Sequence, residues 1–120
     1  MKLGTLTHQG TPWIPRAERA TALFDRLRGL LGRDALGPGA ALLIDHCGDI
    51  HTLGMRFPID VIFLDRAWRV IRIVRDVPPG RITVWGGWRA RRVLETEAGR
   101  VDLAALKPGD TLEWSERVSD

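Results

Sequence analysis

Residues 59–77 have the sequence IDVIFLDRAWRVIRIVRDV, and this stretch decides the fold class. Ile59 to Leu64 form a run that is apolar on both faces, which is typical of a central β-strand. Arg69 to Val77 are rich in β-branched side chains with arginines between them, which also favours a strand. Asp65 to Trp68 form a short link, and the Pro-Pro-Gly sequence at 78–80 ends the second strand. We therefore expect a hairpin within a β-rich protein.

Further short strands are predicted on both sides of this hairpin. Apolar or β-branched runs bounded by glycine or proline indicate strands within Lys2–Ile14, Ala40–Ile44, Arg91–Thr96 and Thr111–Trp114. The expected fold is mainly β, a single compact β-sandwich or partly open barrel with one short N-terminal helix. At this length we expect a single domain over residues 1–120.

The one predicted helix lies between about Arg19 and Leu31. Apolar side chains recur there at intervals of three and four residues, which is the period of an amphipathic helix. We expect this helix to pack Leu23, Leu27 and Leu30 onto the sheet.

Composition limits the class of protein. The chain has 120 residues, 44% of them hydrophobic and 28% charged, so it is neither a disordered tail nor a membrane protein. Cys47 is the single cysteine and cannot form an internal disulfide, which favours a reducing compartment. No signal-peptide pattern occurs in residues 1–20, so we expect a cytoplasmic location.

Arginine dominates the basic residues. The net charge is only +3, yet 16 of the 18 basic residues are arginine. They are scattered along the chain rather than gathered in one block, which disfavours nucleic-acid binding. Because arginine pairs well with carboxylates and phosphates, its abundance favours a small anionic ligand or a protein partner.

The densest group of reactive side chains includes Cys47 and His51. If the chain is extended here, Cys47, His51 and Met55 face the same way, and such a trio suits Cu(I) or zinc. A thiolate beside a histidine is also a candidate nucleophile. A closed zinc site needs four ligands, however, and there is no second cysteine, so we expect no metal site. The common alternative is a buried, inert cysteine with a hydrogen-bonded histidine.

Asp60 stands at the entrance to the apolar strand, where an unpaired carboxylate would be costly to bury. Its expected partners are Arg56 or the backbone N–H groups of a neighbouring loop. We favour a structural clamp over an acid that faces a ligand.

Residues 85–92 have the sequence WGGWRARR. Trp85 and Trp88, with the arginines that follow, are suited to stacking on bases or binding an anionic ligand. In the alternative interpretation, the two indole rings close one end of the core and the arginines face solvent.

Residues 47–65, CGDIHTLGMRFPIDVIFLD, closely resemble the family called domain of unknown function 192 (DUF192). RGLLGR at 28–33, VLE at 93–95 and PGD at 108–110 match the family in the same order. The resemblance implies a small, mainly β domain with a short helix, and it supplies no biochemical activity. Trp68 and Gly54 depart from the family, which usually has a glycine and an aromatic residue there. The positions that match most plainly are Gly29, Arg33, His51, Met55, Arg56, Pro58, Asp60, Glu95, Gly99, Gly109 and Asp110.

The leading functional hypothesis is a non-enzymatic ligand-binding or accessory module with a polar cleft near residues 51–60. The predicted cleft residues are His51, Met55, Arg56, Asp60, Trp85 and Trp88. The alternative is a small hydrolase or transferase that uses Cys47 or His51 with Asp60 as acid or base. The sequence assigns no catalytic residue, cofactor or oligomeric state.

Overall fold

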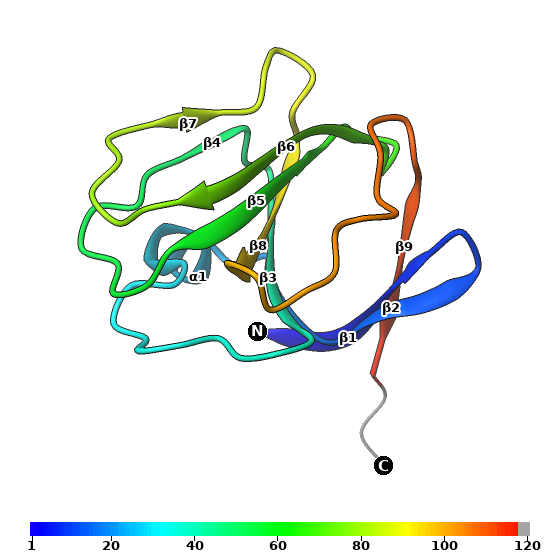
Figure 1. The fold of residues 1–120 in the computed structure, drawn as a ribbon, viewed down its shortest axis with the longest axis horizontal. Coiled ribbons are helices and arrows are strands. Elements are labelled where there is room, and N and C mark those ends of the chain that lie inside the picture. Colours follow the sequence, from blue (N-terminus) through cyan, green and yellow to red (C-terminus); the bar gives the residue numbers. More distant parts are fainter. Residues whose placement is uncertain (118–120) are drawn as a thin grey trace.

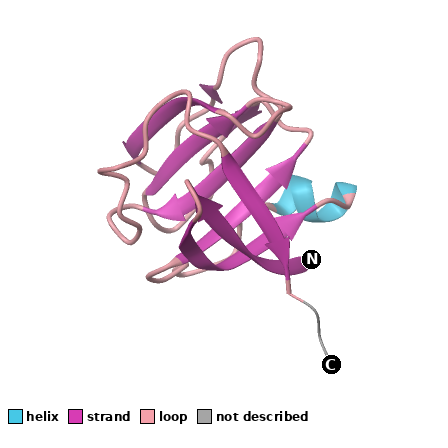
Figure 2. Ribbon diagram, turned by 90° about the vertical axis from the view of Figure 1, so that its right-hand side faces the viewer, coloured by secondary structure: helices cyan, strands magenta, loops and turns pink. Residues whose placement is uncertain are grey.

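The structure, a computed structural model, describes residues 1–117, apart from the side chains of Leu23 and Phe24. This part of the chain is mainly β, as predicted, and strands and loops make up nearly all of it (Figure 2). The elements are β1 (Lys2–His8), β2 (Thr11–Ala20), α1 (Leu23–Arg28), β3 (Ala40–Asp45), β4 (Asp49–Ile50), β5 (Ile59–Leu64), β6 (Val70–Val77), β7 (Val84–Trp85), β8 (Arg92–Glu97) and β9 (Leu112–Glu116). No helix within residues 1–117 is long and apolar enough to cross a membrane.

Seven strands form one sheet in the order β6-β5-β8-β3-β2-β1-β9, and β4 and β7 form a small second sheet (Figure 1). Neighbouring strands are antiparallel except β2 and β3, which run parallel. β5 and β6 form the predicted hairpin. The two outermost strands of the large sheet also approach each other, because the N–H of Val70 donates to the carbonyl of Asp110 at 2.8 Å.

The core consists of two apolar clusters, with side chains of the large sheet alternating between them. β3 and β5 are buried at every residue, as expected for strands that are apolar on both faces. Ile44, Val61 and Val93 belong to the cluster that also includes residues of β4, β7 and the segment after α1. Ile62 and Leu94 point the other way, into the cluster that includes residues of β1, β9 and the 101–106 loop.

The turn between β5 and β6 is held by an aromatic and ionic cluster. Trp68 has a φ of 65°, a backbone conformation that is uncommon for a large side chain. The guanidinium carbons of Arg92 and Arg19 lie 4.3 and 5.2 Å from the centroid of its ring. Both arginines also donate to the buried carboxylate of Asp45, Arg19 at 2.6 Å and Arg92 at 3.0 Å. These two arginines therefore stabilise the fold.

The helix differs from the prediction in length. The sequence predicts it from about Arg19, but residues 16–20 continue β2 because they pair in parallel with 40–44 of β3. The observed α1 has six residues, begins without a side-chain cap and ends at Gly29, whose φ is 53°.

The predicted packing of the helix is correct only in part. Leu27 is 70% exposed, so the expectation that it packs onto the sheet is wrong. Leu30, which follows the helix, is buried in the core. The side chain of Leu23 lies outside the described residues.

Candidate functional site

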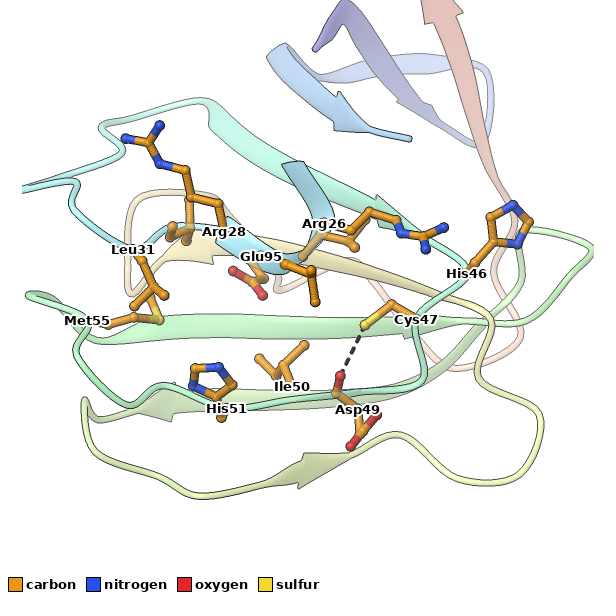
Figure 3. Close-up of a pocket in the computed structure, with 14 residues that line it drawn as sticks. Arg26, Arg28, Leu31, His46, Cys47, Asp49, Ile50, His51, Met55 and Glu95 are labelled. Carbon is orange, nitrogen blue, oxygen red and sulfur yellow. Dashed lines mark hydrogen bonds between the residues drawn. The ribbon is translucent and has the colours of Figure 1, made fainter. Parts of the chain in front are cut away.

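A pocket of about 260 Å³ lies between α1, the segment that joins β3 to β5, and β8 (Figure 3). Its walls come from three separate parts of the sequence, which the fold brings together. The apolar lining is Leu27, Leu30, Leu31, Ile44, Ile50 and Met55. The polar and thiol lining is Arg26, Arg28, His46, Cys47, Asp49, His51 and Glu95, together with Gly29.

Glu95 is the most unusual group in the pocket. It lies on β8 in register with Leu42 on one side and Val61 on the other, so its strand neighbours are apolar. The residue is only 4% exposed, and its carboxylate points into the pocket (Figure 3). Within residues 1–117, no hydrogen bond to this carboxylate is formed. Burial raises its pKa to about 7, against the opposing charge of Arg33.

Glu95 was not predicted from the sequence as a site residue. The sequence feature that could have indicated it is its position: Glu95 shares a face of an apolar strand with Val93, where a carboxylate is costly to bury. What the sequence could not supply was the pocket, because α1 and the 46–51 segment reach Glu95 only in the folded chain.

Cys47 is half-buried and lines the same pocket. Its Sγ donates to the backbone carbonyl of Asp49 at 3.0 Å, and neither His46 nor His51 hydrogen-bonds to it. Burial raises the pKa of the Cys47 thiol, and the charges of Glu95 and Asp49 raise it further. An activated nucleophile needs the opposite, a thiolate stabilised by a nearby base or cation.

Cys47, His51 and Met55 all line the pocket. The extended strand that the shared parity of these residues assumed is not formed, because β4 ends at Ile50 and the chain then turns. Thr52 is fully buried and holds this turn, since its Oγ1 donates to the carbonyl of Pro78 at 2.7 Å and accepts the N–H of Arg81 at 2.8 Å. Thr52 therefore fixes the backbone beside His51.

No group of three or more His, Cys, Asp or Glu side chains in the described part of the chain is arranged to hold a metal ion. The ring of His51 is instead exposed, and its Nδ1 accepts the N–H of Leu53 at 3.2 Å.

Arg56 and Asp60 lie outside this pocket and do not contact each other. Arg56 donates to Asp34 at 2.6 Å on the surface, so it is not the partner of Asp60. Asp60 is buried and accepts the backbone N–H groups of Asp76 at 2.9 Å and Gly99 at 3.2 Å. Those contacts match the expected clamp to backbone N–H groups, and the part of that expectation that named Arg56 is wrong.

Trp85 and Trp88 also lie outside the pocket, on the loop around β7. Their rings are in edge-to-face contact with centroids 5.3 Å apart, and the two side chains are 47% and 87% exposed. The core beneath is closed by Gly86 instead, where an added Cβ would meet the ring of Phe63 at 2.2 Å. The six predicted cleft residues thus do not share one cavity, and their role in ligand binding stays a prediction.

The sequence profile of the DUF192 family, described as "Uncharacterized ACR", matches residues 5–114 of the 120-residue chain. The chain belongs to the DUF192 family. A search of curated proteins finds no match to this DUF192 chain.

Two solved structures share this DUF192 fold. A protein of unknown function from Novosphingobium aromaticivorans DSM 12444 is 26% identical and superposes with a TM-score of 0.77, covering 93% of this chain and 84% of its own. A Sinorhizobium meliloti 1021 protein named as a "putative transcription regulator" is 21% identical with a TM-score of 0.78, covering 94% of this chain and 92% of its own. The second likeness shows the fold alone.

Four of the positions that match the DUF192 family most plainly meet in the pocket. Gly29, His51, Met55 and Glu95 come from three separate segments of the chain and line the same cavity. Arg33, another of these positions, donates to Glu18 at 2.6 Å and acts on Glu95 through its charge.

Proposed function

We propose that this domain is a non-enzymatic binding module that holds a small ligand in the pocket at Glu95. The observation that carries the proposal is a buried carboxylate, without a hydrogen bond from residues 1–117, at the wall of a cavity. The carboxylate is largely removed from bulk solvent and lies at the cavity surface, so its capacity to accept hydrogen bonds is left for a molecule inside the cavity. A ligand with a hydrogen-bond donor would supply the missing partner.

The composition of the pocket supports binding of a small molecule. Six apolar side chains line the wall and polar groups converge between them, and ligand sites combine these two kinds of lining. The volume of about 260 Å³ is below the usual range of pockets that hold drug-sized ligands, so the pocket suits a more compact molecule.

The enzymatic alternative has weaker support. It requires Cys47 or His51 to act with Asp60, but Asp60 opens onto a different cavity, which Arg75, Gly99 and neighbouring residues line. The raised pKa of Cys47, caused first by burial, also disfavours a nucleophile.

We also propose a partly open barrel as the finer description of the sheet. The support is the approach of its outermost strands, where Arg69 and Thr111 form an antiparallel bridge and the N–H of Gly109 donates to the carbonyl of Val70 at 2.7 Å. A sandwich would leave these edges apart.

Cys47 is a built-in reporter for testing the pocket, because it is the single cysteine of the chain. The test is a screen of small amines, alcohols, amides and carboxylates for compounds that slow alkylation of Cys47 by iodoacetamide. A Leu31→Trp variant should fill the pocket and abolish this protection. Leu53→Trp is the matched control, since Leu53 is 45% exposed and does not line the pocket. If no compound protects Cys47 in the wild-type protein, the proposed function is wrong.

A further inference from the structure

We infer that the ligand of this pocket is a small organic cation, an amine or guanidinium with a short apolar body, whose charged group pairs with Glu95. This inference rests on the proposed binding function and names the class of ligand.

The position of Glu95 is the first argument. Its carboxylate is held among apolar strand neighbours, Leu42 and Val61, and faces a cavity whose walls include Ile50 and Met55. When it is ionised it is a buried charge without a paired cation, and a charge in that setting is stabilised most by a cation that donates to it directly.

The arginines of the pocket do not fill this role. Figure 3 shows the guanidinium groups of Arg26 and Arg28 directed away from the carboxylate of Glu95, and neither donates to it. Arg33 is engaged by Glu18 at 2.6 Å. The inner end of the pocket therefore presents an acid that no side chain of the described residues neutralises by direct contact.

The second argument is the charge near Cys47. The lining as a whole holds two arginines and two carboxylates, but the charges felt at Cys47 favour a cation. At the Sγ of Cys47, the charges of Glu95 and Asp49 each act more strongly than the opposing charge of Arg26. An anionic ligand that reached this depth would be repelled by Glu95, whereas a cation would be attracted. The inferred ligand is a cation, whereas the arginine-rich composition favoured a small anionic ligand. Many of the arginines instead make contacts within the protein, as Arg19 and Arg92 do with Asp45.

The occupant is organic rather than a metal ion. No three His, Cys, Asp or Glu side chains within residues 1–117 are placed to ligate one. The cavity of about 260 Å³ has room for a small organic molecule rather than a single ion. That space suits an ammonium or guanidinium group attached to a few carbons.

The test compares three probes of similar shape and different charge: isopentylamine, isopentanol and isovalerate. Their dissociation constants for the full-length protein are measured at pH 8 by calorimetry and by protection of Cys47 from alkylation. We expect isopentylamine to bind at least about tenfold more tightly than the other two, as for a charge-assisted hydrogen bond in a buried site. In Glu95→Gln the affinity for isopentylamine should fall to about that for isopentanol, and the affinity for isopentanol should change little. Glu113→Gln, which removes one exposed carboxylate far from the pocket, should bind like the wild type.

A second measurement does not depend on any variant. Amine affinity for the wild-type protein should rise about tenfold from pH 6 to pH 8, as Glu95 with a pKa of about 7 becomes ionised, while isopentanol affinity should stay constant. Equal or tighter binding of isopentanol or isovalerate, or full amine binding by Glu95→Gln, would overturn the inferred ligand class and leave the binding function standing. If none of the three probes nor any compound of the wider screen protects Cys47, the binding function itself fails.

Discussion

The carboxylate of Asp60 accepts the backbone N–H of Asp76 at 2.9 Å, at one of the two points where the β5–β6 hairpin loses its regular register. Ile59 pairs with Val77 and Val61 with Val74, so two residues of β6 face Asp60 alone. Asp76 takes a φ of 54° there, which is the geometry of a β-bulge. The side chain of Asp60 thus satisfies an N–H that the sheet leaves unpaired.

Asp60→Asn is expected to lower the free energy of unfolding by about 1–3 kcal/mol, the cost of replacing a charged acceptor of buried N–H groups. The side-chain NH₂ of Asn is a donor, so it would face one of the two N–H groups whose hydrogen bonds Asp60 now accepts. Urea titrations of the two proteins at equal m-values measure the difference.

Asp76→Asn is the matched control, since Asp76 is exposed and uses only its backbone N–H in this contact. Asn tolerates the same left-handed backbone, so this variant should change stability by less than about 0.5 kcal/mol. An unchanged unfolding midpoint for Asp60→Asn would contradict the clamp.

The pKa of Glu95, raised by burial from an ordinary 4.5 to about 7, predicts a specific pH dependence of stability. Between these values the folded protein keeps a proton on Glu95 that the unfolded chain releases. Stability from this group is therefore complete below about pH 4.5 and is lost as the pH rises towards 7, by on the order of 3 kcal/mol. Denaturant titrations between pH 5 and pH 8 should show this decline.

Glu95→Gln removes the titrating group and should flatten the profile between pH 5 and pH 8. The other groups that face Glu95 in the pocket and carry or change charge are Arg26, Arg28, His46, Cys47, Asp49 and His51. Glu113→Gln leaves all of them in place and should keep the wild-type slope. A slope that persists unchanged in Glu95→Gln would assign the pH dependence to another of these groups.

Acidification should reveal a second, separate effect at Asp45. Burial alone would raise the pKa of Asp45, but hydrogen bonds and charges from Arg19 and Arg92 outweigh burial and lower it. Its contribution is present above the ordinary value of 3.8 and is lost as the pH falls below it. The two effects together place the maximum of stability in the mildly acidic range.

The two leucines of the helical segment should respond differently to truncation. Leu30→Ala should cost about 2–5 kcal/mol because Leu30 is 2% exposed in the core. Leu27→Ala should cost less than about 1 kcal/mol because Leu27 is largely exposed. Thermal or urea unfolding of the two variants measures both, and equal costs would show that α1 packs through a different face.

The strands were predictable because their cause is local. Ala40–Ile44 is apolar throughout and Ile59–Leu64 is apolar except at Asp60, and a strand buried on both faces requires such a run. The start of the helix was not predictable in the same way. Residues 16–20 carry a pattern compatible with either element, and the parallel pairing with β3, a partner more than twenty positions later, decides for strand.

The candidate site was predictable only in part, for a similar reason. His51 and Met55 were found from the cluster of reactive side chains around them. Glu95 was not, because the property that marks it is burial beside a cavity, and burial depends on contacts between distant segments. Asp60 shows the converse. The sequence indicated that its buried carboxylate needs a partner, but it did not decide between backbone N–H groups and Arg56.

The reactivity of Cys47 offers the most direct check of the charges inside the pocket. Burial, together with the charges of Glu95 and Asp49, raises the pKa of the thiol above its ordinary value of 9.0. Because the thiolate is the reacting form, alkylation by iodoacetamide should have a higher pH midpoint in the folded protein than in the same chain unfolded in urea. Glu95→Gln removes a negative charge and should lower the midpoint of the folded protein. Arg26→Gln removes a positive charge and should raise it, and Glu113→Gln should leave it unchanged. Rates followed by mass spectrometry across the pH range give the midpoints of the unfolded chain and of the four folded proteins. A midpoint of the folded wild type at or below that of the unfolded chain would mean that the inner end of the pocket is not the acidic, desolvated environment described above.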